Sequence, residues 1–269
     1  MIKFDSMTKA RYTLTLCFFL LFVGNLLGQK QDSIRAEYLL PFGGGFQVTG
    51  AQLASRYGTF LDLNLGFKFK NTKGWTFGLN FDYLFESRIK DSTIFSQLEN
   101  EFGQITGTSG VPVPVRFSGI GAKLDLEIGK IIPITTRNKN GGLWITGRIG
   151  YLQHKIRMFG ELDNLPQLSG EYRKGYDRLS HALNYSAFIG YLYLPPLIRS
   201  KISEIPTYDN IFGLYAGIEI SSGWAYSLRS YNFSSMSATS HPQLGRMLGF
   251  KIGWIFTMEH RKKNGDHYY

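Results

Sequence analysis

The chain has 269 residues, of which 15% are aromatic and 31 are glycine, and its formal net charge is +10 at pH 7. The single cysteine, Cys17, lies in the first apolar segment, which excludes disulfides and thiolate chemistry from the rest of the chain. After residue 30 no segment approaches the roughly 18 consecutive apolar residues of a transmembrane helix, so only strands could cross a membrane.

The first residues have the features of an export signal. Lys3, Lys9 and Arg11 precede an apolar run from Leu14 to Leu27, and the sequence becomes polar after Gly28. A basic start, an apolar stretch and a small residue at its end are typical of a secretory signal peptide. We expect a signal peptide at residues 1–28 and one domain at 29–269. A signal anchor stays open, because Leu26 is not the small residue that cleavage prefers.

Strict alternation of apolar and polar residues dominates the middle of the chain. Between Tyr57 and Lys70 the odd positions are mostly apolar and the even positions mostly polar, and the pattern resumes from Trp75 to Phe85 after a short turn. Successive strand side chains point to opposite faces, so each segment has an apolar face and a polar face. The segments are about twice the usual strand length of five or six residues. Strands that cross a membrane need about 9–11 residues.

Eight such strands can be drawn along the chain. They lie at Ser33–Leu40, Tyr57–Lys70, Trp75–Phe85, Val115–Ile131, Leu143–Arg157, Leu179–Leu194, Asn210–Arg229 and Met247–Thr257. We predict an all-β fold, an eight-stranded antiparallel transmembrane β-barrel with long extracellular loops, short periplasmic turns and both termini in the periplasm. A soluble β-sandwich or lipocalin-like barrel would also alternate. Aromatic residues at the predicted strand ends favour the outer membrane.

The predicted inward face collects charged residues near the middle of the strands. An eight-stranded barrel is just wide enough for its own side chains to fill it, and buried charges must pair. We therefore predict a salt-bridge network that plugs the interior, with an ion or proton pathway as the alternative. Its members are Asp62, Asp82, Lys123, Asp125, Glu127, Arg148, Glu219 and Lys251.

No motif indicates catalysis, and the histidines lack a metal-ligand spacing such as HExxH. We expect no enzyme, no cofactor and no metal. The alternative is an enzyme at the outer rim acting on lipid or peptide, because small barrel enzymes place His, Asp and Ser there. The residues at that predicted rim are His154, Asp177, Ser180 and His181.

The predicted loop from Ile89 to Pro114 contains a helical spacing of apolar residues after Asp91 or Ser92, either of which could cap a helix. The face comprises Ile94, Phe95, Leu98 and Phe102. It could pack on the barrel rim or contact another protein, and we predict it as a candidate partner face. Loops of this length are usually functional.

Several stretches are similar to one family of proteins. They are residues 74–83, 150–155, 175–179 and 253–255, and the likeness extends over nearly everything after Gln29. The chain resembles the small outer-membrane β-barrel proteins of the Bacteroidota. The resemblance implies an accessory subunit of a large envelope machine, such as the type nine secretion system or the β-barrel assembly complex.

Together these patterns predict a non-enzymatic outer-membrane barrel that acts as a scaffold or accessory subunit of a larger complex for protein secretion or outer-membrane protein assembly. Its expected partners are outer-membrane lipid and other outer-membrane or periplasmic proteins, and nucleic acid is excluded by export. A free-standing surface or porin-like barrel is the alternative.

Overall fold

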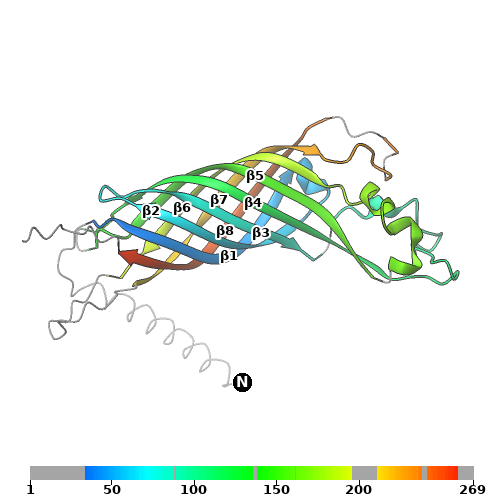
Figure 1. The fold of residues 1–269 in the computed structure, drawn as a ribbon, viewed down its shortest axis with the longest axis horizontal. Coiled ribbons are helices and arrows are strands. Elements are labelled where there is room, and N and C mark those ends of the chain that lie inside the picture. The colour runs from blue at the N-terminus through cyan, green and yellow to red at the C-terminus, as the bar shows by residue number, and fades with distance from the viewer. Residues whose placement is uncertain are drawn as a thin grey trace, which may run out of the picture.

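A computed structural model describes residues 34–87, 89–135, 138–160, 162–195, 211–234, 236–237 and 241–259. Each strand pairs antiparallel with the next, and β1 also pairs with β8, which closes the sheet into one barrel (Figure 1). The predicted eight-stranded antiparallel barrel is confirmed. The predicted signal peptide lies outside the described residues.

The strands are long and steeply tilted (Figure 1). They are β1 (Glu37–Ala51), β2 (Thr59–Lys70), β3 (Trp75–Glu86), β4 (Val115–Ile132), β5 (Gly142–Gly160), β6 (Ser180–Tyr193), β7 (Ile211–Ser227) and β8 (Gln243–Glu259). Among the described residues no helix is both long enough and apolar enough to cross a membrane.

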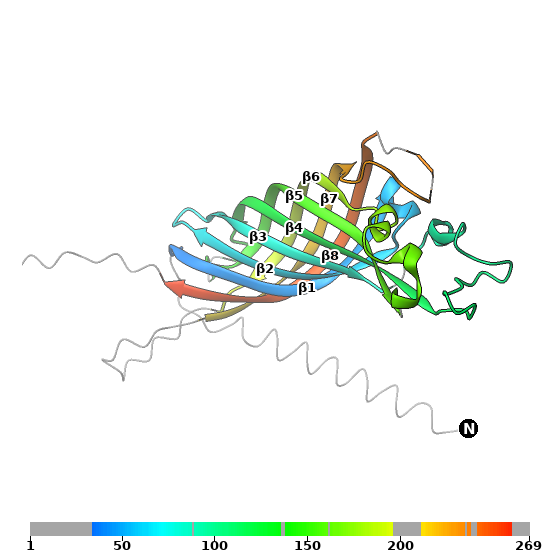
Figure 2. The same ribbon diagram turned by 45° about the vertical axis from the view of Figure 1, so that its right-hand side comes forward.

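The two ends of the barrel differ. The connections 52–58, 87–114, 161–179 and 228–242 meet at one end, called the loop end here, which lies at the right in Figures 1 and 2. It carries the five short 3-10 helices η1 (Gln52–Ser55), η2 (Ser92–Phe95), η3 (Leu162–Asn164), η4 (Pro166–Leu168) and η5 (Tyr172–Gly175). At the opposite end, the turn end, β2, β4, β6 and β8 end and β1, β3, β5 and β7 begin.

Alternation along the strands sorts side chains into an apolar exterior and a polar interior. On β2, Leu61, Leu63 and Leu65 are exposed, whereas Asp62 and Asn64 between them are buried. The same pattern repeats on β3 and through the second half of β4. The barrel therefore has the reverse of a soluble protein's distribution, because its apolar side chains face outward around a charged core.

Strand β1 corrects the first predicted boundary. The predicted strand ends at Leu40, whereas Pro41 and the glycines after Phe42 are residues typical of a loop. The strand continues to Ala51. A Cβ atom on Gly43 would overlap the carbonyl of Ile252, and one on Gly45 would overlap the carbonyl of Phe250. These glycines permit the close approach of β8 that closes the barrel.

Only one turn-end connection is very short, between β2 and β3. The side-chain oxygen of Asn71 accepts hydrogen bonds from the backbone N–H groups of Lys73 and Trp75, both at 2.9 Å. Gly74 has φ +78°, a conformation that glycine adopts without steric cost. The turn is therefore fixed largely by residues close together in the sequence.

Candidate functional site

The barrel interior holds a network of buried ion pairs centred on Lys251. Its Nζ lies 2.7 Å from Asp82 Oδ1, 3.0 Å from Glu219 Oε2 and 3.1 Å from Asp62 Oδ2. Four strands, β2, β3, β7 and β8, contribute these residues, so the cluster connects opposite walls of the barrel. All four side chains are fully buried, and each charge is thus stabilised by its partners rather than by water.

Glu219 is the carboxylate with the most cationic partners. Besides Lys251, it lies 2.7 Å from Lys123 Nζ and 2.5 Å from an Nη of Arg148. Arg148 also contacts Glu127 through its Nε at 2.6 Å. Glu127 in turn binds Lys68 at 2.5 Å. Lys68 is not among the predicted members of the network. The signal that would have found Lys68 is its inward position on the same face as Asp62 and Asn64.

Asp125 departs from the predicted network. It is buried, yet no ion pair joins it to any described residue, and neither carboxylate oxygen has a hydrogen-bond partner. Its register partners are Asn80 on β3 and Gly150 on β5, and neither offers a cation. The nearest cationic side chains along the strands, Lys123 and Arg148, are both directed to Glu219. The expectation that every inward charge is paired is therefore wrong at this position.

Apolar layers close the interior on both sides of the ion pairs. Toward the turn end, Trp144 lies under the ammonium of Lys68, with 4.5 Å from Nζ to the ring centroid. The remaining members of this turn-end seal are Leu39, Ile131, Phe188, Leu192, Leu194, Tyr215 and Ile255. Sequence patterning does not single out this seal, because inward apolar residues near strand ends resemble outward ones.

At the loop end a second apolar cluster covers the barrel mouth. Phe95 of the β3–β4 connection stacks on Phe117 of β4, with ring centroids 3.8 Å apart, and also contacts Tyr176. Tyr57, predicted to face outward in a band of aromatic residues, is instead fully buried against Phe60 and His154. Residue 57 precedes β2, so strand alternation does not set its direction.

The predicted partner face is not formed. Ile94 and Phe95 are buried in the loop-end cluster, Leu98 is half-buried against it, and Phe102 is 84% exposed. The expected helix ends with η2 at Phe95, and Asn100 then turns the chain by accepting hydrogen bonds from the N–H groups of Phe102 and Gln104. For Ile94 and Phe95, the structure agrees with the alternative in which the face packs on the barrel rim.

The four predicted rim residues do not form a hydrogen-bonded chain of nucleophile, base and acid. His154 faces inward, with its Nδ1 3.3 Å from the hydroxyl of Tyr57, whereas His181 lies on the outer side between Tyr151 and Tyr226. Ser180 donates its hydroxyl to the carbonyl of Arg178 rather than to a histidine. Asp177 binds Arg229. In the described part of the chain there is also no group of three side chains that could hold a metal ion.

Comparison with known proteins finds no matching family model and no significantly similar curated sequence. The chain is similar to the solved structure of Ail, the attachment invasion locus protein of Yersinia pestis, with TM-score 0.43 and 10% identity over 83% of this chain and 99% of Ail. It is also similar to Neisserial surface protein A (TM-score 0.39, 9% identity, 82% and 96% covered) and to outer membrane protein OprG from Pseudomonas aeruginosa (TM-score 0.38, 9% identity, 86% and 99% covered). These scores assign no family.

Asp177 has a structural role that can be tested. Its carboxylate receives two hydrogen bonds from Arg229, including Nε at 2.9 Å, and one from the N–H of Leu179. We expect Asp177→Ala to weaken the packing of the β5–β6 and β7–β8 connections by about 1.5–3 kcal/mol, the usual size of hydrogen bonds to a charged group. Limited trypsin digestion should then cut these connections faster than in the wild type.

The matched control for this variant is Glu171→Gln, because Lys174 is its one ion-pair partner among the described residues and the pair is exposed. Exposed ion pairs contribute little, so its digestion should match the wild type. Equal digestion of Asp177→Ala and wild type would contradict the structural role.

Proposed function

We propose that this chain is an outer-membrane barrel with a closed interior that acts, without catalysis, as a scaffold or accessory subunit of a larger outer-membrane complex. The proposal includes export by a signal peptide at residues 1–28. The observation that carries it is the combination of a sealed interior with ordered loops that expose apolar side chains.

The outer surface supports the membrane location. The exposed aliphatic side chains form a continuous belt around the strands, which would be an aggregation hazard in water but suits contact with lipid tails. Its members include Leu61, Leu63, Leu65, Leu79, Leu124, Leu126, Ile128, Ile149, Leu183, Ile189, Ile218, Ile220, Leu248 and Ile252. Aromatic side chains such as Trp75, Tyr151 and Trp254 are exposed as well, as expected near the headgroups.

The two ends of the barrel support an orientation in the membrane. Bacterial barrels carry long loops on the cell surface and short turns in the periplasm. We therefore assign the loop end to the exterior and the turn end, with the start of β1 and the end of β8, to the periplasm.

A closed interior leaves the surfaces as the functional part of the molecule. Two tight turns in the β3–β4 connection each present one exposed apolar side chain, Phe102 beside Gly103 and Val111 beside Gly110. Backbone hydrogen bonds hold both turns, from Gly103 to Asn100 and from Gly110 to Gly107. We infer that these two side chains contribute to a contact site for another protein.

The experiment is gentle extraction of a tagged chain from native membranes, followed by mass spectrometry. We expect stoichiometric co-purifying envelope proteins with the wild type, and their loss in the double variant Phe102→Ser, Val111→Ser. The control is Ile134→Ser, which removes a similarly exposed apolar side chain at the turn end. It should retain partners bound at the loop end.

Recovery of the wild-type barrel alone, at monomer mass, would contradict the subunit role and favour a free-standing surface barrel. Recovery of the chain in the soluble periplasmic fraction would contradict the membrane location itself.

A further inference from the structure

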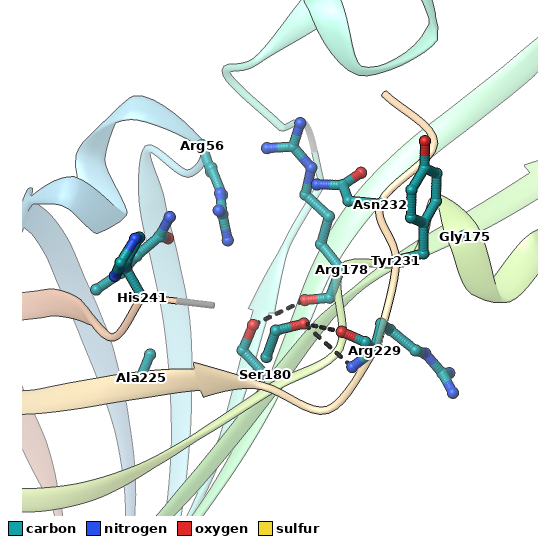
Figure 3. A pocket seen from close by; sticks show the side chains of 11 residues that line it. Arg56, Gly175, Arg178, Ser180, Ala225, Arg229, Tyr231, Asn232 and His241 are labelled. Atoms are coloured by element: carbon teal, nitrogen blue, oxygen red, sulfur yellow. Dashed lines mark hydrogen bonds between the residues drawn. The ribbon is translucent and has the colours of Figure 1, made fainter. Parts of the chain in front are cut away.

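A basic cavity opens at the loop end, above the ends of β6, β7 and β8. Its volume is about 20 Å³, it is partly open to solvent, and its floor includes Ser180, Ala225 and Gln243. Figure 3 shows Arg56 and His241 on one side of the cavity, with Arg178 and Asn232 facing them. The cavity lies inside the mouth of the barrel rather than on its lipid-facing side, because its floor is made of inward-facing strand residues.

The arginines around this cavity differ in whether a carboxylate pairs with them. Arg229 is paired with Asp177, and its guanidinium points away from Arg56 (Figure 3). Arg178 lies 3.3 Å from Asp91 and donates to Ser234 at 2.6 Å. For Arg56, by contrast, no ion pair or side-chain hydrogen bond joins its guanidinium to any described residue. None of the lining side chains is a carboxylate.

This arrangement is electrostatically incomplete. Burial lowers the pKa of the Arg56 guanidinium, and the nearby positive charge of Arg178 lowers it further, against the opposing effects of Tyr57 and Asp91. Burial also lowers the pKa of Arg178, against the opposing effect of Asp91. The Nε of Arg178 is buried and has no hydrogen-bond acceptor among the described residues. A negatively charged group between the two arginines would offset both effects and supply acceptors.

We propose that this cavity binds one oxyanion group, a phosphate or a sulfate, carried by a soluble molecule that enters from outside the barrel. Guanidinium groups present paired N–H donors that match the oxygens of such groups. Asn232 also lines the cavity, and its side-chain amide offers a neutral donor. The inference goes beyond the proposed function, since it requires the folded barrel but no protein partner.

The test uses the full-length barrel in phosphatidylcholine nanodiscs, titrated calorimetrically with inorganic phosphate and with inorganic sulfate. We expect saturable binding of at least one of the two ions. Arg56→Gln should weaken it by about tenfold or more, because one charge-assisted contact is lost. Arg56→Gln is the better first variant, because the Arg56 guanidinium makes no ion pair or hydrogen bond with another described residue. Its replacement should therefore leave the loops folded.

Two further variants distinguish the loss of a cavity residue from the loss of one positive charge elsewhere. Lys174→Gln removes one positive charge from the neighbouring η5, outside the cavity, and should bind like the wild type. Arg178→Gln should also weaken binding, and heat-modifiable gel mobility would check that it still folds. Equal affinity in Arg56→Gln and wild type, or no saturable binding of either ion, would overturn the proposal.

A second series in nanodiscs containing phosphatidic acid distinguishes the source of the oxyanion. We expect the affinity for the free ions to be unchanged, because the cavity does not face the lipid. The contrary result is that phosphatidic acid weakens the binding of the free ions in the wild type and leaves it unchanged in Arg56→Gln. That result would indicate a lipid headgroup as the ligand and contradict a soluble one.

Discussion

Glu219→Gln is expected to destabilise the barrel by about 3–5 kcal/mol, the usual consequence of removing one partner from a buried ion pair. Glu219 contacts Lys123, Arg148 and Lys251 in the interior, all of them fully buried or nearly so. Glutamine keeps the volume of the side chain but removes its charge, which leaves three cations with fewer counter-charges. Unfolding by urea of the protein in lipid vesicles, followed by gel mobility, measures the change.

Asp125→Asn is the matched control, because it makes the same change in charge at an equally buried carboxylate that has no ion pair. Its stability should equal or exceed that of the wild type, since an unpaired buried carboxylate is costly. Equal losses in the two variants would show that pairing does not govern the stability of the interior. A loss at Asp125 alone would contradict the network as described.

Trp144→Ala is expected to destabilise the barrel by about 3–5 kcal/mol, as large-to-small substitutions at buried aromatic residues do. Trp144 is 1% exposed and makes edge contacts with Phe188 and Tyr215, with ring centroids 5.6 and 5.8 Å apart. Its replacement removes the largest side chain of the turn-end seal. Trp224→Ala, at a 49% exposed outward position, should lose much less.

The same variant tests closure of the interior. We expect neither wild type nor Trp144→Ala to give single-channel steps in a planar bilayer, because the ion pairs and the loop-end cluster still block the path. Steps from the wild type would contradict the closed interior. Steps from Trp144→Ala alone would show that the turn-end seal is the only barrier.

The alternation of residues along the chain was sufficient to predict the barrel and the direction of most strand side chains. The inward placement of all eight predicted network residues follows from this one property, because the direction of a strand side chain depends only on its position along its own strand. Asp62 and Lys251 are far apart in sequence, yet each was assigned to the interior independently. The turn at Asn71–Gly74 is also local, because the residues of the turn itself fix its geometry.

Contacts between strands distant in sequence could not be predicted in this way. The glycines at 43 and 45 indicate a loop locally, and only the approach of β8 makes them strand residues. Whether an inward charge finds a partner depends on register and closure, which pair Glu219 with three cations and leave Asp125 with none. The burial of Tyr57, Ile94 and Phe95, and the convergence of Arg56 and Arg178 on one cavity, depend on how the loops fold over the mouth. The sequence by itself therefore determined which face each strand residue occupies, because that is a local geometric property. The tertiary structure decided which residues meet inside the barrel and at its mouth, because those contacts join strands and loops that no local pattern relates.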